Sequence, residues 1–167
     1  MEESKNQCST GCRGHCSSCH EVEHGCPVCG NQGLEVPFET VENLTTTFIK
    51  EQLKHYQDEK FYLCLNKTCH VAYFTPDKAI ILLSQLNVPI WFKRQKNEYY
   101  VCYCRRITLD DIIDAVKMLN KEEVTISDVI KFYNKEEVIT DCLHNNPTGL
   151  SCDKLFENAI KYAQKHK

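Results

Sequence analysis

The stretch Gly25-Cys-Pro-Val-Cys-Gly-Asn-Gln-Gly33 decides how the first half of this chain folds. Cys26 and Cys29 are two residues apart, a spacing that lets one tight turn present both thiols to a single metal ion. Glycines stand at both ends of the stretch and directly after Cys29, where the backbone must bend sharply around a metal. The stretch therefore predicts a metal-binding knuckle.

A second pair of cysteines follows the knuckle at a longer interval. Two predicted strands, 61–65 and 71–74, are joined by the turn 66–70, so Cys64 and Cys69 lie at a strand end and in a hairpin turn. Four thiolates in two chelating pairs are typical of a closed structural zinc site. We predict that Cys26, Cys29, Cys64 and Cys69 bind Zn²⁺. Two alternatives are His70 in place of Cys69 as the fourth ligand, and ordinary buried thiols without a metal.

The surrounding pattern predicts an α+β fold, with a small β-containing zinc-knuckle subdomain at 25–100. Apolar residues at helical spacing predict a helix over 40–53 with Thr40 as its N-cap. Further strands are predicted at 89–92 and 99–103, on either side of the polar segment 93–97.

After Cys104 the apolar period becomes helical, which predicts an all-helical subdomain at 101–167. Thr108-Leu-Asp-Asp111 has the form of a capping box. Ser127 and Ser151 are candidate N-caps of two further helices. No internal repeat is visible in either half.

The second half carries its own set of four cysteines: Cys102, Cys104, Cys142 and Cys152. Cys102 and Cys104 lie on one side of an extended segment, because side chains alternate along a strand. Cys152 is predicted on the first turn of the last helix, where the N–H groups and the helix dipole favour a thiolate. The residues alone predict a four-thiolate metal site and leave [2Fe–2S] and zinc open.

The N-terminal segment 1–24 is polar and contains a third set, Cys8, Cys12, Cys16 and Cys19, flanked by histidines. A segment of this composition gains order only from a metal, so the set is a candidate third centre for Zn²⁺, Cu⁺ or a [4Fe–4S] cluster. Its C-x3-C-x2-C spacing equals that of radical-SAM enzymes, but 167 residues are too few for their barrel. The alternative is a metal-scavenging or redox-active tail without a fixed site.

Composition narrows the class of protein. Twelve cysteines in 167 residues would suit a disulfide scaffold, but the start shows no secretory signal and the close pairs favour metals. The net charge of −3 argues against a nucleic-acid partner. The apolar run 79–83 is too short for a membrane span, so we predict a cytoplasmic protein. No phosphate loop or nucleophile elbow is present, so we predict no enzyme, apart from a redox activity toward Cu(II).

Several of these segments resemble a known family. Cys26-Pro-Val-Cys-Gly, Phe61-Tyr-Leu-Cys-Leu, Val71-Ala-Tyr-Phe, Val101-Cys-Tyr-Cys and the stretch from Cys142 through Asn146-Pro-Thr-Gly149 to Cys152 look like the N-terminal zinc and [2Fe–2S] domain of archaeal CopZ copper chaperones. Val101-Cys-Tyr-Cys with Ile107-Thr-Leu-Asp-Asp is also similar to the opening of bacterioferritin-associated ferredoxin. The resemblance implies a [2Fe–2S] cluster on Cys102, Cys104, Cys142 and Cys152, zinc on the knuckle set, and electron transfer that reduces Cu(II) to Cu(I).

The leading functional prediction is a small [2Fe–2S] electron-transfer protein, or a module of a larger redox or metal-handling system, with a redox or metal-transfer protein as its partner. One alternative is a copper metallochaperone that binds or reduces copper, although the ferredoxin-like domain with a Met-x-Cys-x-x-Cys loop that such chaperones carry is not within these residues. The other is a structural or regulatory adaptor held together by metals.

Two arginines, Arg105 and Arg106, follow the C-x-C pair and are predicted to be solvated charges. The alternative is that they dock an acidic partner or tune the cluster.

Overall fold

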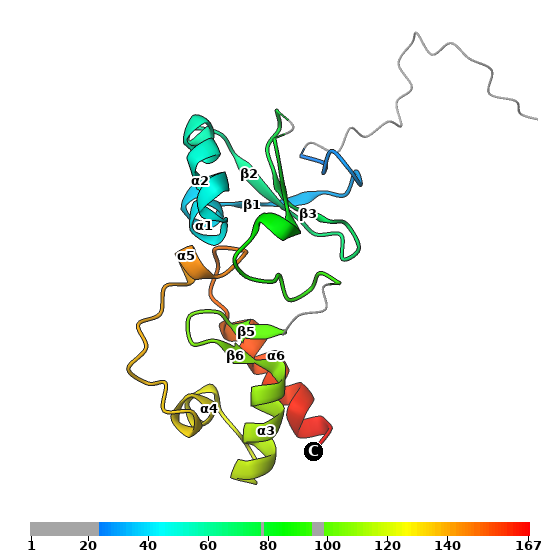
Figure 1. Cartoon of the computed structure of the whole chain (residues 1–167). Helices are drawn as coiled ribbons and strands as arrows, with labels where there is room; N and C mark the ends of the chain where they lie inside the picture. Colours follow the sequence, from blue (N-terminus) through cyan, green and yellow to red (C-terminus); the bar gives the residue numbers. More distant parts are fainter. Residues whose placement is uncertain (1–23, 78, 95–98) are drawn as a thin grey trace, which may run out of the picture.

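The computed structural model describes residues 24–77, 79–94 and 99–167, and within them it has the predicted α+β fold. Its first half is built on an antiparallel sheet with the order β1-β2-β3-β4 (Figure 1). The strands are β1 (Gly33–Val36), β2 (Phe61–Cys64), β3 (Val71–Phe74) and β4 (Ile80–Leu82). Every residue of β2 and β3 is buried, because these are the central strands and both faces are covered.

Two short helices, α1 (Phe38–Leu44) and α2 (Thr47–Leu53), stand where one helix was predicted over 40–53. The break falls at Thr45 and Thr46, both of which have extended backbone angles. The Thr45 hydroxyl donates back to the Glu42 carbonyl at 3.0 Å, an example of the local side-chain hydrogen bonding by which Thr competes with a helix. Thr40 is not the N-cap of α1, a position held by Pro37.

The helices and the sheet enclose one apolar core, which includes Val41, Leu53, Phe61, Leu63 and Tyr73. Two 3₁₀ turns, η1 (Lys54–Tyr56) and η2 (Leu83–Gln85), complete this half. The strand predicted at 89–92 is not formed. Pro89 has no N–H for a ladder, and the Trp91 N–H instead donates to the Tyr103 hydroxyl at 3.1 Å.

The second half adds a strand pair to the predicted helices, so it is not all-helical. β5 (Tyr100–Cys102) pairs with β6 (Ile107–Thr108), and α3 (Leu109–Leu119), α4 (Ile126–Phe132), α5 (Cys142–Asn145) and α6 (Asp153–Lys165) follow. Residues of α3, α4 and α6 enclose a second core with Val101, Ile107 and Phe156. None of the helices in the described ranges is long and apolar enough to cross a membrane.

The predicted helix starts were partly right. Thr108 and Asp111 form the expected capping box, with the Thr108 hydroxyl accepting from the Asp111 N–H. The cap of α4 is Thr125 rather than Ser127, and the N-cap of α6 is Cys152 rather than Ser151. Ser151 still accepts a hydrogen bond from the Asp153 N–H at 3.2 Å, so its side chain supports the same helix start.

Candidate metal centres

The knuckle is a tight loop held by its own backbone. The Cys26 N–H donates to the Asn31 carbonyl and the Gly30 N–H to the Cys26 carbonyl, both at 2.8 Å. Gly30 has φ +73°, a left-handed conformation that glycine adopts without strain. The register of β1 and β2 places the loop beside the second cysteine pair, because β1 begins at Gly33, which lies opposite Cys64 of β2.

The four knuckle thiols converge as predicted. Their sulfur atoms all lie within 4.8 Å of one another, and the Sγ atoms of Cys29 and Cys64 are 3.7 Å apart. A tetrahedral ion with Zn–S bonds of about 2.3 Å needs sulfurs roughly 3.8 Å apart, so the geometry fits one zinc ion. His70 is exposed and is not in this group. The eight described cysteines are free thiols, which agrees with metal binding rather than disulfides.

The protein environment separates the pKa values of the knuckle thiols. Burial alone would raise the pKa of Cys29, but the Asn31 backbone N–H and the thiol of Cys64 lower it to about 7. Burial raises the pKa of Cys64 to about 12 and also raises that of Cys69. Burial thus opposes deprotonation of Cys64 and Cys69, so zinc binding must displace protons from these two thiols.

Lys93 is a functional residue that the sequence prediction missed. Its side chain is 5% exposed, and its ammonium donates to three backbone carbonyls of the hairpin turn: Asn66 at 2.8 Å, Val71 at 3.0 Å and Cys69 at 3.3 Å. The charge also lowers the pKa of the Cys64 thiol. Four thiolates around Zn²⁺ leave two net negative charges, so a buried cation beside the turn stabilises the loaded site. The sequence analysis had placed Lys93 in a polar segment between two predicted strands.

The second set of cysteines also converges, from three separate parts of the chain. Cys102 ends β5, Cys104 lies in the β5–β6 turn, Cys142 begins α5 and Cys152 caps α6. The Cys152 thiol interacts electrostatically with the thiols of Cys102 and Cys142, and the Cys104 thiol interacts with that of Cys142. Cys102 and Cys152 are buried, whereas Cys104 and Cys142 are partly exposed. Cys102 and Cys152 thus form a buried inner pair, and Cys104 and Cys142 form a partly exposed outer pair.

The second set is wider than the knuckle. Among the described residues, the knuckle is the only group of three or more ligating side chains whose donor atoms all lie within 4.8 Å. A thiol set more open than a single-ion tetrahedron suits a larger metal centre with two ligands per metal.

Two groups act on the sulfurs of the second set. The Asp141 backbone N–H donates to Cys104 Sγ at 3.3 Å. The positive charge of the Arg105 guanidinium helps to lower the pKa of the Cys102 thiol, and its Nε donates to the Lys135 carbonyl at 3.1 Å. Arg105 is therefore not a purely solvated charge, whereas Arg106 is exposed. Such donors stabilise negative charge on thiolate ligands.

The pKa values of the inner pair differ from the sequence prediction. The thiol of Cys152 donates to Cys102, and with Arg105 it lowers the pKa of Cys102 to about 6 against the effect of burial. The same hydrogen bond raises the pKa of Cys152. The prediction of a lowered Cys152 pKa at the start of α6 is wrong for the metal-free protein, because its direct partner outweighs the helix dipole.

The candidate third set, Cys8 to Cys19, lies outside the described residues.

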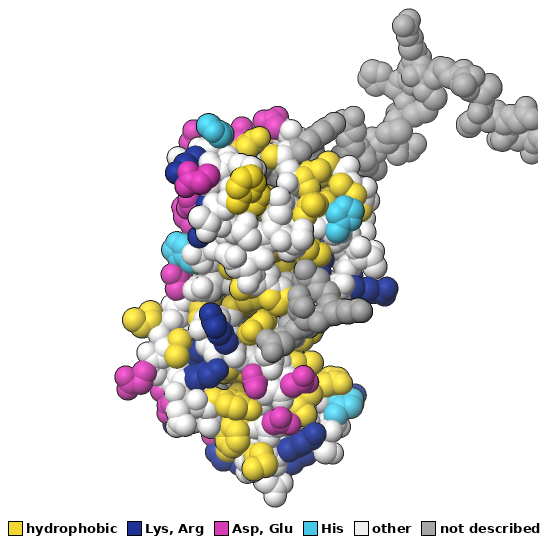
Figure 2. Space-filling view, viewed as in Figure 1, with side chains coloured by type: hydrophobic (Ala, Val, Ile, Leu, Met, Phe, Trp, Pro, Cys, Tyr) yellow, Lys and Arg dark blue, Asp and Glu magenta, His cyan; other side chains and the backbone are white. Residues whose placement is uncertain are grey.

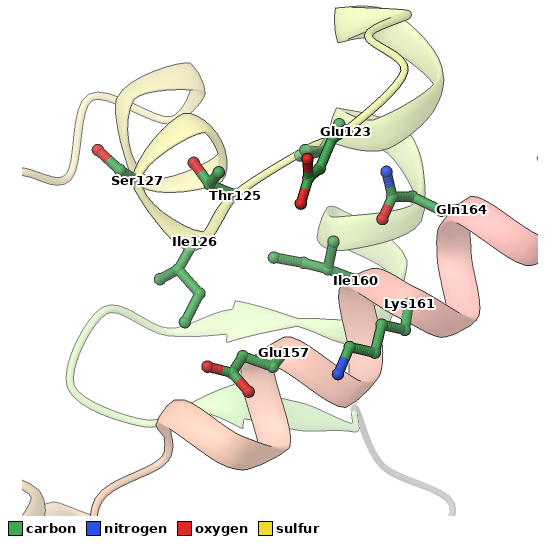
Figure 3. Close-up of a pocket in the computed structure, with 9 residues that line it drawn as sticks. Glu123, Thr125, Ile126, Ser127, Glu157, Ile160, Lys161 and Gln164 are labelled. Carbon is green, nitrogen blue, oxygen red and sulfur yellow. The ribbon is translucent and has the colours of Figure 1, made fainter.

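A groove of about 530 Å³ between α4 and α6 is lined by Glu123, Thr125, Ile126, Glu157, Ile160 and Lys161, among others (Figure 3). These side chains are not the sulfur or imidazole ligands of the metal sites. On the face shown in Figure 2, acidic and basic side chains are interspersed rather than gathered in a patch of one sign.

Comparison with known proteins first identifies a class. The family model of the CopZ zinc-binding domain matches residues 23–87, which contain the whole knuckle set. Residues 23–87 are thus similar to the CopZ zinc-binding domain, and the predicted zinc site lies within the matched range.

One protein, through its sequence and a solved structure of its N-terminal domain, extends the similarity beyond this domain. The copper chaperone CopZ of Archaeoglobus fulgidus is 28% identical over 128 residues, which are 76% of this chain and 57% of that protein. The chain thus spans little more than half the length of this curated relative. The X-ray structure of the CopZ N-terminal domain from the same organism aligns with a TM-score of 0.61 and 24% identity, covering 80% of this chain and 95% of that structure. The shared fold therefore includes most of the second half.

Proposed function

We propose that this chain is a non-enzymatic metal-handling protein of the copper-chaperone type. In it, zinc at the knuckle is structural, and the second cysteine set holds a redox-active [2Fe–2S] cluster. The observation that carries the proposal is the convergence of Cys102, Cys104, Cys142 and Cys152 beside a CopZ-like zinc-binding domain.

The donor set suits the cluster. Two irons bridged by sulfides need two thiolates each, and four thiols in an inner and an outer pair supply that number. A bound cluster would supply one electron at a time, the chemistry that reduces Cu(II) to Cu(I). The chain would stabilise its negative charge through the Arg105 guanidinium and the Asp141 N–H. The outer pair, Cys104 and Cys142, would mark the side from which electrons reach or leave the site.

Copper handling is favoured over the leading sequence prediction of a general electron-transfer protein. The support is the matched zinc-binding domain and the relative named as a copper chaperone. Electron transfer then becomes the step that serves copper, with a metal-transfer protein as the partner. The adaptor held together by metals is the competing function, because it needs neither iron nor copper.

One anaerobic preparation tests the proposal. We expect one zinc and two irons per chain from the eight described cysteines, a charge-transfer spectrum that dithionite bleaches, and an S = 1/2 signal after reduction. The dithionite-reduced protein, freed of excess reductant, should convert one Cu(II) per cluster into Cu(I), detected with a Cu(I)-specific chelator.

Paired variants assign each metal to its site. Cys104→Ala and Cys152→Ala should abolish the iron signal and the copper reduction while retaining the knuckle zinc. A chain beginning near Gly25 removes any contribution from the N-terminal cysteines. If the shortened chain contains zinc in both four-cysteine sites and no iron, copper reduction fails as the function and the adaptor replaces it.

A further inference from the structure

The segment 141–149 belongs in sequence to the helical half but packs against the zinc-binding half. Its helix, α5, lies beside α1 in Figure 1, and residues of the two helices are in contact. The segment buries Asn146 and Pro147. Because Cys142 is the first residue of α5, this docking places a candidate ligand of the second centre against the zinc-binding half.

Three side chains of the zinc-binding half hold the backbone of this segment. The Thr40 hydroxyl donates to the Leu143 carbonyl. The Asn43 amide donates to the His144 carbonyl at 2.8 Å, and the Tyr73 hydroxyl to the Pro147 carbonyl at 2.8 Å. Thr40 and Tyr73 have no solvent exposure. The hydrogen bonds of Thr40 and Tyr73 fix the backbone in one place, because a buried partner left unpaired would lose its water without compensation, whereas the Asn43 bond lies at the surface.

Close packing at Gly149 adds a steric constraint. Gly149 has φ +69°, and a Cβ built there would lie 2.8 Å from both Pro37 Cδ and Thr40 Oγ1. The loop therefore approaches α1 more closely than any residue with a side chain would allow. The segment is hydrogen-bonded to α1 through the carbonyls of Leu143 and His144, and it packs closely against the start of α1 at Gly149.

The same segment contacts the second cysteine set directly. It contains Cys142, and its Asp141 N–H donates to Cys104 Sγ. The carbonyls held by Thr40 and Asn43 follow Cys142 immediately in the chain. A shift of α1 would therefore move one candidate ligand and the hydrogen-bond donor of another.

We infer that Thr40, Asn43 and Tyr73 are positioning residues of the second metal centre, so that the zinc-binding half sets the geometry of that centre. The inference rests on the proposed function, since it takes the second cysteine set to be metal-binding. It also connects the two sites physically. Tyr73 lies in β3, which begins two residues after the zinc ligand Cys69.

The test uses variants with matched controls. Thr40→Val removes a buried hydroxyl that donates to the segment, whereas Thr45→Val removes an equally buried hydroxyl that donates within α1. Asn43→Leu is matched by Asn87→Leu, because the Asn87 amide donates at 2.8 Å to the Thr45 carbonyl of the same half. Thr40→Ser keeps the hydroxyl and serves as the rescue variant.

In the full-length, anaerobically purified protein, Thr40→Val and Asn43→Leu should alter the EPR g values and the reduction potential of the iron centre, with unchanged zinc content. The control variants and Thr40→Ser should leave both at their wild-type values. Amide exchange over 141–149 should quicken roughly five- to thirtyfold in Thr40→Val, as expected when a buried hydrogen bond is lost, and less in Asn43→Leu, whose hydrogen bond is exposed.

The two measurements separate failure of the inference from failure of the proposed function. If the wild-type protein contains no iron, the proposed function fails, and amide exchange of the zinc-loaded variants still decides whether Thr40 and Asn43 hold the segment. If the positioning variants and their controls give the same spectra, potentials and exchange rates, the inference is wrong.

Discussion

The two four-cysteine sites differ in how many elements of the fold supply their ligands, although both sets span similar lengths of chain. The knuckle takes its thiols from one turn and one hairpin of a single sheet, and they meet within 4.8 Å. The second set draws on a strand end, a short helix and a helix cap, and is held partly by the other half of the molecule. The geometry of the knuckle therefore depends on a single sheet, whereas that of the second site depends on contacts between the two halves of the molecule.

The largest expected effect comes from breaking the local site. Cys26→Ser should lower the zinc content by one atom per chain and remove folding free energy on the order of 10 kcal/mol, the scale of a structural zinc. Metal analysis and thermal unfolding measure the two effects. The second centre should weaken as well, because Tyr73 and α1 belong to the half that loses zinc.

Cys104→Ala is the matched variant, and it should keep one zinc and a stable sheet. An unchanged zinc content in Cys26→Ser would contradict the knuckle assignment. A fully retained second centre in that variant would show that the two sites are independent.

A smaller effect should follow from removing the buried cation beside the knuckle. Lys93→Met deletes a charged donor to three carbonyls, so we expect a loss of about 1.5–3 kcal/mol of unfolding free energy. Unfolding at fixed zinc concentration and zinc release to a chelator measure the change.

Lys60→Met is the control for Lys93, because within the part of the chain that the structure describes Lys60 forms an exposed pair with Glu35 at 3.3 Å. Its effect should stay within about 0.5 kcal/mol. Equal stability and equal zinc retention in the two variants would show that Lys93 does not support the site.

The smallest effect concerns the helical half alone. Thr108→Ala removes the N-cap of α3 and should cost about 1 kcal/mol, with faster amide exchange in α3 and no change in zinc content. Ser127→Ala should have little effect, since the structure assigns the cap of α4 to Thr125. A larger loss for Ser127→Ala than for Thr108→Ala would contradict this assignment of caps.

Local patterns in the sequence predicted the features that depend on neighbouring residues. The knuckle set followed from its spacing, and the Thr108 cap from the residue three positions later. The resemblance to CopZ chaperones was confirmed for the zinc-binding domain. The subdomain limits and the ligands of the second centre remain predictions.

What the sequence did not reveal depends on distant contacts. Thr40 was taken for a helix cap, but its hydroxyl holds a carbonyl 103 residues further along the chain. Lys93 has the composition of a surface turn, and only the folded hairpin supplies the three carbonyls around it. No periodicity or motif records such pairings, because the residues that meet have no fixed spacing.

The docking of 141–149 on α1 has a consequence for the order of biosynthesis. The predicted zinc ligands are complete once Cys69 has left the ribosome, whereas the second set needs Cys152. At translation rates on the order of 5–20 residues per second, the interval lasts several seconds or more. During that time α1 can fold before the segment 141–149, which packs against it, has been synthesised. Metal loading would then follow the direction of translation, with zinc acquired first and the second centre assembled on a surface that zinc has already ordered.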